Sequence, residues 1–510
     1  MKRDGASTSL WQFSMHDYQP RETQLSDMAY DVIIVGGGIT GLSTGLMLQK
    51  SGKQCLIAEA KSIGFGTSGG TTAHLNTAMD TPYNEIEKSF GAEAAALVRK
   101  AASDAISLIR SNISAHHIDC GFSEQQAYIY SQDDEQSQEL EKIFEASLNA
   151  GCVVHYADKI PVPIDFKKAV VFEGQAQFHP SKYLFGLAKA FEEAGGVIFN
   201  DCRVTSVSGN DELEIDSSRG KMKTNALIYA THVPPGVNLL HFRCAPYRSY
   251  AMAIKLADSN YPEGLAYDMY DPYHYYRTQE VDGQKYLIAG GEDHKTAHEE
   301  NTNACFQRLE AYLSKYFAIG GISFKWSSQY YQPVDGLPYI GHLPGNPSNV
   351  YVATGYGGNG MTYSHVAAQL LTDIITKKVS PLEKLFSPSR TKPVAGFNDF
   401  VKEAADVVGT LIGKWFHSDN IDALGEIAKG EAKVVKYEGD QLAIFKDADG
   451  NLHAVNPACT HIDCKVAWNN AEESWDCPCH GSRFNIDGEM LTAPARKDLE
   501  KIDLRKKADE

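Results

Sequence analysis

Two pairs of metal-binding residues lie close together near the end of the chain. Cys459 is separated by one residue from His461, Cys477 is separated by two from His480, and fifteen residues lie between the pairs. Each pair offers one thiolate and one imidazole, so two short loops can bring four ligands to one centre. Such a set suits a tetrahedral zinc ion or an iron–sulfur cluster whose two irons bind the thiolates and the imidazoles respectively.

The spacing resembles the Rieske [2Fe-2S] signature, because both Cys-x-His and Cys-Pro-Cys-His-Gly are present. The resemblance assigns Cys459 and Cys477 to one iron of the cluster. It assigns His461 and His480 to the other iron, where neutral ligands raise the potential above that of an all-cysteine cluster. On this basis we favour iron over zinc.

The same resemblance extends to residues around the four ligands. In high-potential Rieske proteins two extra cysteines pair, so Cys464 and Cys479 are expected to form a disulfide that clamps the ligand loops. Ser482 and Phe484 stand where respiratory Rieske proteins often carry Ser and Tyr, whose hydroxyls donate to sulfur and favour the reduced cluster. Since Phe484 has no hydroxyl, we predict a midpoint potential below that of the respiratory proteins.

A glycine-rich turn near the start of the chain joins a predicted apolar strand to a predicted helix. Gly36, Gly38 and Gly41 form the pattern GxGxxG. The first glycine permits a tight turn, the second lets a pyrophosphate approach the backbone, and the third lets the helix pack on the strand. Glu59 ends the next predicted strand, where an acid can accept hydrogen bonds from ribose hydroxyls. The pattern predicts a site for FAD or NAD.

Six further segments resemble the D-amino-acid-oxidase-like superfamily of FAD enzymes, which includes enzymes that oxidise glycine, sarcosine and dimethylglycine. The resemblance spans about residues 30–378 and implies that the cofactor is FAD. The segments are residues 66–72, 178–183, 203–204, 230–232, 335–341 and 355–362.

The resemblance also implies roles for individual residues. Thr67 and Ser68 would lie near the flavin and the pyrophosphate, and Val204 would meet the adenine through its backbone. A second glycine-rich loop would open a helix whose free amides face the pyrimidine edge of the flavin, where the reduced ring carries negative charge. This loop contains Gly358, Asn359, Gly360, Met361 and Thr362.

An aromatic cluster over residues 267–277 can line a substrate cavity or form a packed hairpin. Aromatic rings with one cation suit an amine or an amino acid, and Tyr276 and Arg277 are the candidate catalytic residues. In some amino-acid-oxidising relatives an Arg or Lys of the glycine-rich loop holds the substrate carboxylate. This chain has Gly358 and Thr362 there, which argues against an amino acid.

The composition excludes several classes of function. The chain has 510 residues, of which 43% are hydrophobic and 22% charged, as in soluble globular proteins. A formal net charge of −17 argues against a nucleic-acid partner, because phosphate backbones require a clustered positive surface. No apolar stretch is long enough to be a transmembrane segment, and the N-terminal segment lacks the apolar region of a signal peptide. We therefore expect a cytoplasmic protein.

Alternating strand and helix patterns predict an α/β FAD-binding Rossmann-like domain with an interleaved mixed-sheet substrate domain, followed by a small all-β Rieske domain. Strands are predicted over residues 31–35, 54–58 and 350–353, and helices over 94–111, 136–150, 182–194, 364–376 and 398–415. The expected domains are an N-terminal extension (1–29), an FAD-dependent oxidoreductase (30–378), a linker with a helix (379–425) and a Rieske domain (426–510).

Together these features predict an FAD-dependent dehydrogenase that oxidises a small amine, N-methylated amine or amino acid by hydride transfer to flavin. The Rieske cluster would pass the electrons on to an unknown acceptor. Two alternatives remain open at this point. One is a redox sensor or electron-transfer protein without an organic substrate, and the other is an oxidase that uses O2 directly.

Overall fold

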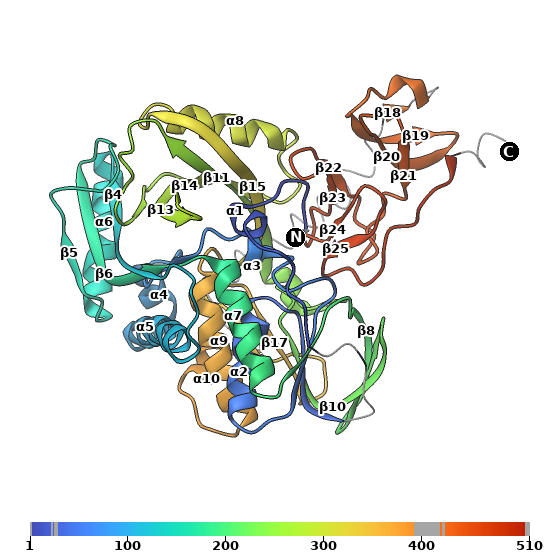
Figure 1. Ribbon diagram of the computed structural model, residues 1–510, viewed down its shortest axis with the longest axis horizontal. Helices are drawn as coiled ribbons and strands as arrows, with labels where there is room; N and C mark the ends of the chain where they lie inside the picture. The colour runs from blue at the N-terminus through green and yellow to red at the C-terminus, as the bar shows by residue number, and fades with distance from the viewer. Residues whose placement is uncertain (1–2, 22–23, 25–28, 392–418, 421–423, 505–510) are drawn as a thin grey trace.

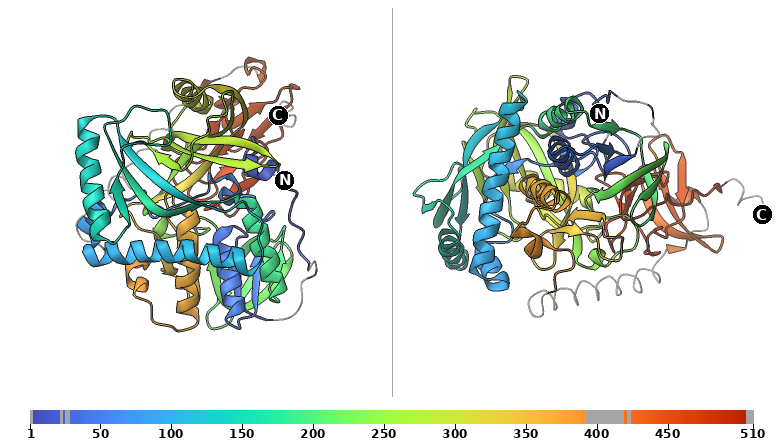
Figure 2. Two further views of the ribbon diagram at one scale, coloured as in Figure 1. Left: turned by 60° about the vertical axis from the view of Figure 1, so that its left-hand side comes forward. Right: turned by 90° about the horizontal axis from the view of Figure 1, so that it is seen from below.

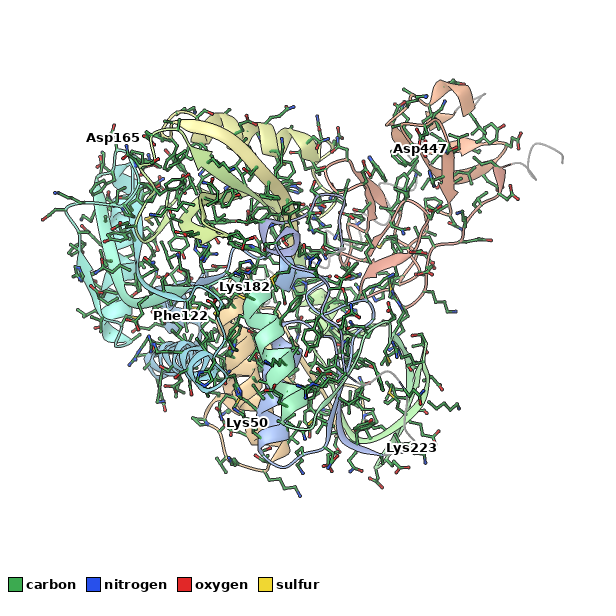
Figure 3. All side chains as sticks on the ribbon, viewed as in Figure 1. Lys50, Phe122, Asp165, Lys182, Lys223 and Asp447 are labelled. Carbon is green, nitrogen blue, oxygen red and sulfur yellow. A yellow bond between two sulfur atoms is a disulfide. The ribbon has the colours of Figure 1, made fainter. Side chains whose placement is uncertain are left out.

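The structure is a computed structural model that describes residues 3–21, 24, 29–391, 419–420 and 424–504. Two large sheets with packed helices form most of the molecule, and a smaller all-β unit follows at the C-terminal end (Figure 1). Charged side chains such as Asp165, Lys223 and Asp447 lie at the outer rim (Figure 3). The predicted helix over 398–415 falls outside the described residues.

The first sheet contains the predicted nucleotide-binding strands. Its strand β1 alternates between two cores, because Val32 and Ile34 pack on the helical side while Ile33 and Val35 pack on the other. The strand order is β16 (Tyr339–His342), β17 (Val350–Thr354), β10 (Gly220–Tyr229), β1 (Tyr30–Val35), β2 (Cys55–Ala58) and β7 (Val197–Phe199), with β9 (Leu213–Ser217) and β8 (Val204–Gly209) beside β10.

Helices α2, α7 and α9 cover one face of this sheet (Figure 1), and the long helix α5 runs beside that layer (Figure 2). The four helices predicted over 94–111, 136–150, 182–194 and 364–376 are present, with boundaries that differ by a few residues. The larger helices are α2 (Ile39–Lys50), α4 (Tyr83–Phe90), α5 (Ala92–Ala115), α6 (Asp134–Asn149), α7 (Pro180–Glu193), α8 (Thr302–Leu313) and α9 (Gly360–Ile375). The short ones are α1 (Leu10–Phe13), α3 (Thr67–Gly70), α10 (Leu382–Phe386) and the 3-10 turns η1 (Leu239–Phe242) and η2 (Leu424–Glu426).

The second sheet is mixed and has α8 packed on one face. It includes the segment with the aromatic cluster, which forms the end of β12, the start of β13 and the connection between these two paired strands. Its order is β15 (Ile319–Pro333), β11 (Cys244–Leu256), β14 (Gln284–Lys295), β13 (Tyr275–Val281), β12 (Leu265–Tyr267), β4 (Ser123–Ser131), β6 (Lys168–Gln177) and β3 (His74–Leu75), with β5 (Val154–Tyr156) beside β6.

The C-terminal unit consists of two four-stranded sheets, in agreement with the predicted all-β domain. Figure 1 shows it next to β11 and β15. One sheet contains β18 (Asp419–Asn420), β19 (Ala432–Tyr437), β20 (Asp440–Lys446) and β21 (Leu452–Val455). The other contains β22 (Ala467–Asn469), β23 (Ser474–Asp476), β24 (Arg483–Phe484) and β25 (Met490–Thr492).

The N-terminal segment, for which the sequence predicted only an extension, contains a short helix and packs into the fold. Its short helix α1 places Trp11, which is fully buried, against Trp326 and His179 at ring-centroid distances of 6.4 and 5.1 Å. Earlier in the segment, Arg3 and Asp4 are also buried. Hydrophobic periodicity could not predict the burial of this segment, because the segment is buried through ion pairs and single aromatic contacts.

Six buried side chains join the N-terminal segment, the second sheet and the C-terminal unit, and we call them the interface network. No side chain of the network is more than 3% exposed. Arg3 pairs with Glu472 (3.2 Å) and Asp4 (3.3 Å), Arg483 pairs with Asp4 (3.1 Å) and Asp476 (3.1 Å), and Arg248 pairs with Asp476 (3.4 Å). Removing one member would leave a buried charge without its partner, which is costly, so the network holds the three segments together.

Candidate functional site

The glycine-rich turn after β1 has no room for side chains. A Cβ on Gly36, whose φ is +112°, would lie 2.5 Å from the Ala230 carbonyl oxygen, and a Cβ on Gly41 would lie 1.9 Å from that of Gly36. A Cβ on Gly38 would lie 2.9 Å from Ser68 Oγ. Gly38 caps α2 without a side chain, so the start of the helix stays open to a phosphate. The turn therefore fits the pyrophosphate of FAD.

Glu59 follows β2 at the same edge of the sheet. One carboxylate oxygen accepts a hydrogen bond from the Gly37 amide (2.6 Å) and the other from the Lys61 amide (2.8 Å). Burial raises the pKa of Glu59, and these amides lower it again. Glu59 and Val204, the first residue of β8, both line one large cavity. Contacts of these two residues with ribose and adenine stay predictions.

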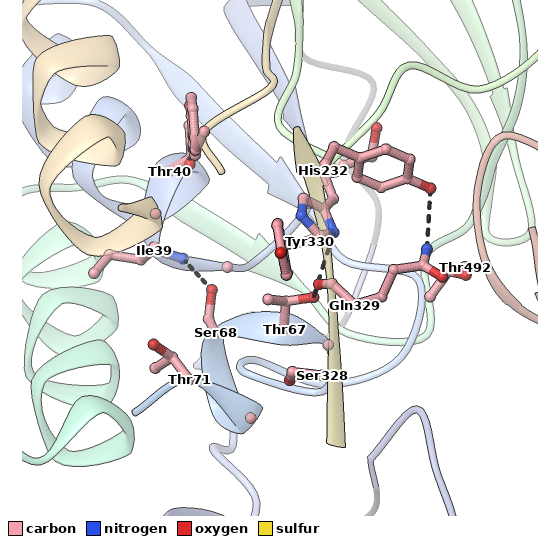
Figure 4. Close-up of a pocket in the computed structure, with 18 of the residues that line it drawn as sticks. Ile39, Thr40, Thr67, Ser68, Thr71, His232, Ser328, Gln329, Tyr330 and Thr492 are labelled. Carbon is pink, nitrogen blue, oxygen red and sulfur yellow. Dashed lines mark hydrogen bonds between the residues drawn. The ribbon is translucent and has the colours of Figure 1, made fainter. Parts of the chain in front are cut away.

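Thr67 and Ser68 line the same cavity from α3 (Figure 4). Ser68 Oγ accepts a hydrogen bond from the Ile39 amide at the start of α2 (3.1 Å). Thr67 Oγ1 donates to the Gln329 carbonyl oxygen (3.1 Å) and lies 3.3 Å from His232 Nδ1. The α3 turn is thus tied to the nucleotide-binding helix on one side and to β15 on the other.

The start of α9 differs in part from the expected row of free amides. Gly358, Asn359, Gly360 and Met361 line the cavity, as predicted for a flavin-facing loop. The Gly358 amide, however, donates to Asp80 Oδ2 (2.5 Å). An acid that reaches this loop from a distant segment leaves no local pattern in the sequence.

Two neighbours complete the contacts of this loop. Asn359 Oδ1 accepts from the Asp80 amide (2.8 Å), so Asp80 is bound to the loop at two points. Thr362 is fully buried, and its hydroxyl donates to the Asn76 carbonyl oxygen (3.1 Å). Among the described residues that line the cavity, Thr362 is absent, and its predicted contact with FAD is not supported by this arrangement.

The aromatic cluster is a cavity wall, but not through the two residues we took as catalytic candidates. Tyr267, Tyr273 and Tyr275 line the cavity, whereas Tyr276 and Arg277 do not. Neighbouring residues of a strand face opposite sides, so Tyr276 points into the core beneath α8. Arg277 donates to the carbonyl oxygens of Ala73 (3.3 Å) and Phe178 (3.1 Å), and its guanidinium lies 5.0 Å from the Trp11 ring.

This arrangement makes Arg277 a structural cation. It is fully buried one layer behind the cavity wall, and burial lowers its pKa to about 9. Strand alternation places Arg277 on the same side as Tyr275, but its guanidinium is bound by the backbone of two earlier segments, at Ala73 and Phe178. Two acids that the sequence analysis missed, Asp80 and Asp293, line the cavity instead. The one available signal is that Asp293 follows the apolar run of β14 at its end.

The four predicted cluster ligands are brought together in the C-terminal unit. The thiols of Cys459 and Cys477 lie within hydrogen-bonding distance of each other, and the rings of His461 and His480 are 4.9 Å apart. Nδ1 of both rings is buried without a hydrogen-bond partner among the described residues. Two facing thiols and two unpartnered imidazole nitrogens fit the Cys₂His₂ set of a [2Fe-2S] cluster.

A disulfide joins Cys464 to Cys479, with 6.5 Å between their Cα atoms. The sulfurs of both residues lie within 4.8 Å of Cys477 Sγ, so the bond covers one side of the ligand set. Ser482 is buried nearby, and its hydroxyl lies within hydrogen-bonding distance of the Cys459 sulfur. Phe484 is fully buried in the same core.

Comparison with known proteins agrees with both sites. The profile described as FAD dependent oxidoreductase matches residues 31–374, and that described as Rieske [2Fe-2S] domain matches residues 418–503. The chain belongs to the FAD dependent oxidoreductase family. It is 35% identical over 481 residues to YhfW of Bacillus subtilis (strain 168), which carries the name of a Rieske 2Fe-2S iron-sulfur protein, with 94% of each chain covered.

Two further relatives match the flavoprotein part. Gamma-glutamylputrescine oxidoreductase of Escherichia coli (strain K12) is 24% identical over 387 residues, which are 72% of this chain and 89% of the relative. The crystal structure of glycine oxidase from Geobacillus kaustophilus has the same fold, with a TM-score of 0.58, 18% identity, and coverage of 72% of this chain and 100% of the other. The oxidoreductase therefore binds FAD, and its Rieske domain binds a [2Fe-2S] cluster.

The Rieske domain forms part of the wall of the FAD cavity. Met490, Leu491, Thr492, Ala493, Ala495 and Arg496 of this domain line the cavity, and Figure 4 shows Thr492 near Gln329 of β15. Tyr331 Oη donates to the His480 carbonyl oxygen (3.1 Å), and Gln329 Nε2 donates to that of Gly481 (2.9 Å). The second ligand loop is therefore bonded directly to residues that line the FAD cavity.

The flavoprotein part also supplies aromatic contacts to both cluster histidines. The His241 ring lies 4.8 Å from that of His461 and 5.7 Å from that of His480, and the Phe242 ring lies 5.3 Å from His480. His461 Nε2 lies 3.2 Å from the Gly236 carbonyl oxygen. Sequence analysis missed these residues because η1 and the preceding loop have no motif of their own.

Among the described helices, none is long and apolar enough to cross a membrane.

Proposed function

We propose that this oxidoreductase is a dehydrogenase of a small amine, N-methylated amine or amino acid. A hydride would leave the carbon next to nitrogen for FAD, and the resulting imine would be hydrolysed by water. The electrons would then pass to the [2Fe-2S] cluster and on to an acceptor that remains to be found. Bound FAD supplies the hydride acceptor and the cluster supplies a one-electron exit.

The observation that carries this proposal is the shared wall between the two cofactor sites. Tyr331 and Gln329 line the FAD cavity, and both donate hydrogen bonds to the backbone of the Rieske ligand loop. His232 lies between the α3 turn and this pair, because it contacts Thr67 and packs edge-on against the Tyr331 ring at 4.7 Å. Electrons leaving the cavity would therefore cross packed protein over a short path.

The interface network supports a fixed path. Its three arginines and three acids connect β11, the N-terminal segment and the Rieske domain through contacts of 3.1 to 3.4 Å. Breaking such a buried pair is costly, so the domains are held in one relative position. Transfer would then require no domain movement.

The remaining residues have positioning roles in this proposal. Gly36, Gly38 and Ser68 would hold the pyrophosphate at the start of α2, and Glu59 the ribose. Cys459, Cys477, His461 and His480 would hold the cluster. The names of the relatives support an organic substrate, since one is an oxidoreductase of gamma-glutamylputrescine and another a glycine oxidase.

Anaerobic stopped-flow absorbance of the holoprotein tests the proposal. A panel of amines, N-methylated amines and amino acids is mixed with oxidised protein, and the flavin and cluster bands are followed separately. We expect a substrate to bleach the flavin first and the cluster afterwards. In the variant Cys459→Ser, which lacks a cluster ligand, flavin bleaching should persist and the second phase should disappear.

Two outcomes would contradict the dehydrogenase proposal. Reduction by protein electron donors but by no member of the panel would indicate an electron carrier or sensor. Hydrogen peroxide formed in an amount equal to the substrate consumed in air, with no change in the cluster bands, would indicate a direct oxidase.

A further inference from the structure

The charged residues that line the FAD cavity are separated into two groups. Arg203 and Arg496 are the only arginine or lysine side chains among the described residues of the lining. Both lie at the nucleotide end, since Arg203 acts on the carboxyl of Glu59 and Arg496 Nη2 donates to the Pro235 carbonyl oxygen (3.1 Å). Two acids, Asp80 and Asp293, line the part of the cavity formed by the aromatic wall.

Asp80 presents its carboxylate to the interior of the cavity. The side chain is exposed and lines the cavity, and the surrounding protein desolvates the carboxyl enough to raise its pKa to about 6. The Gly358 amide, its hydrogen-bond donor at 2.5 Å, lowers that value in part. No ion pair joins Asp80 to a Lys, Arg or His in the described part of the chain.

Asp293 lies near the end of β14, where the hydroxyls of Ser249 and Tyr330 approach its carboxylate. Tyr330 Oη donates to Oδ2 at 2.9 Å, whereas Oδ1 is buried and has no hydrogen-bond partner within the described residues. Burial raises the pKa of Asp293 to about 7, against the lowering effect of the Ser249 and Tyr330 hydroxyls. A buried carboxylate oxygen without a donor is costly, which points to a missing partner in the cavity.

Tyrosine rings separate and surround the two carboxylates. Tyr273 lines the cavity with Asp80 and Asp293, and burial, followed by the negative charges of these two acids, raises its pKa. Tyr267, Tyr275 and Tyr330 line the cavity beside it. Aromatic faces attract ammonium groups, so these walls suit the same charge as the acids.

A substrate carboxylate would find no counterpart here. The nearest buried arginine behind this wall, Arg277, uses its guanidinium to bind the carbonyl oxygens of Ala73 and Phe178. His274, which lowers the pKa of Asp293 slightly, is bound to Asp268 at 2.8 Å. An anion beside Asp80 and Asp293 would instead meet two like charges in a confined space.

We propose that this part of the cavity binds a small aliphatic amine with two cationic nitrogen atoms and no carboxylate, with one nitrogen beside Asp80 and the other beside Asp293. Two ammonium groups would neutralise two carboxylates, supply a donor to Asp293 Oδ1 and contact the tyrosine faces. The inference rests on the proposed function and narrows its substrate class to diamines.

The test compares matched compounds on the oxidised holoprotein under anaerobic conditions. The probes are α,ω-diaminoalkanes with three to six methylenes, the 1-aminoalkanes of equal length, and the ω-aminoalkanoates that replace one ammonium by a carboxylate. Stopped-flow mixing gives two readouts: the rapid change in the flavin spectrum reports binding, and the later bleaching reports reduction. Binding decides the present inference, and bleaching decides the proposed function.

We expect at least one diamine to bind roughly tenfold or more tightly than its aminoalkanoate twin, as charge-assisted hydrogen bonds imply. Asp80→Asn and Asp293→Asn keep the side-chain shape but remove the charge. Each should weaken binding of that diamine roughly tenfold to a hundredfold and should narrow the discrimination against the carboxylate. Glu310→Gln, a change of the same charge on the exposed face of α8, should leave both constants unchanged.

Folding of each variant is checked by its FAD content and by the paramagnetic spectrum of the reduced cluster. The inference is overturned if the aminoalkanoates bind as tightly as the diamines, or if Asp80→Asn and Asp293→Asn affect diamine binding no more than Glu310→Gln does. Diamine binding without flavin bleaching would support this binding site and reject the proposed dehydrogenase. Bleaching of the flavin by a carboxylate-bearing amine, and by no diamine, would support the proposed dehydrogenase and reject the diamine site.

Discussion

Two sets of charged side chains in this protein are arranged in opposite ways. In the interface network every arginine faces an acid, and three positive side chains meet three negative ones. In the cavity, Asp80 and Asp293 form no ion pair with a Lys, Arg or His among the described residues. The comparison indicates that the charges of the interface network are neutralised by one another, while the two acids of the cavity are available to a cationic ligand.

The largest effect should come from breaking the paired set. Arg483→Met leaves the carboxylates of Asp4 and Asp476 without their shared partner, so we expect a loss of about 3 to 5 kcal/mol in the free energy of unfolding. Urea unfolding followed by cluster absorbance measures it. Lys223→Met, which removes an exposed ion pair with Glu212, is the control and should leave the unfolding midpoint unchanged. A midpoint equally unchanged in Arg483→Met would contradict the role of the network.

Removing a charge from the unpaired set should increase the free energy of unfolding, whereas breaking the paired set decreases it. Asp293→Asn, measured in the holoprotein without amine, should raise the free energy of unfolding by about 1 to 3 kcal/mol at pH 8. Burial raises the folded-state pKa of Asp293 to about 7, so the ionised carboxylate destabilises the folded state. This penalty grows as pH rises from about 4 to 7.

The gain from Asp293→Asn should therefore be largest above pH 7 and should shrink as the pH is lowered toward 4. Thermal unfolding of both proteins at pH 8 and pH 5 measures the difference. A variant that is less stable than the parent protein at pH 8 would contradict the prediction, because it would show that the ionised carboxylate of Asp293 is stabilised by a partner.

The cluster pocket lies between the paired and the unpaired set. The charge of the cluster changes when it is reduced, and hydrogen-bond donors, not charged side chains, stabilise that change. Ser482 is placed so that its hydroxyl can donate to the Cys459 sulfur. Ser482→Ala should lower the midpoint potential by roughly 20 to 60 mV, which corresponds to about 0.5 to 1.5 kcal/mol for one electron. Protein-film voltammetry measures it, and a potential that stays constant or rises would contradict the assignment.

The smallest expected effect comes from adding a dipole. Phe484 is fully buried in the core that contains Cys459 and Cys477. Phe484→Tyr should raise the midpoint potential by about 20 mV, because a new hydroxyl near sulfur favours the reduced cluster. The same voltammetry measures it, with the paramagnetic spectrum as a check that the cluster is intact, and a potential that does not rise would contradict the prediction.

The local elements of the fold were predictable from the sequence. The apolar run before Gly36 formed β1, the predicted helix after it formed α2, and four further helices appeared within a few residues of their expected positions. The ligand loops were predictable for the same reason. A GxGxxG turn or a Cys-x-His pair is a local arrangement whose chemistry requires a fixed spacing.

What could not be predicted depends on contacts between distant segments. Arg277 was a candidate catalytic residue, but the backbone at Ala73 and at Phe178, in two distant segments, binds its guanidinium behind the cavity wall. Asp80 reaches the α9 loop across 278 residues of sequence, and Arg3 pairs with Glu472 across 469. No spacing rule links such pairs, because each is set by the packing of two sheets and the docked domain.

The contribution of Met490–Arg496 to the cavity wall restricts how this protein could have arisen from modules. An ancestral flavoprotein that gained a Rieske domain had to replace part of its own cavity wall with residues of the added domain. A chimera that exchanges the tail for that of a distant homologue would therefore leave a hole beside the coenzyme, even if both halves fold.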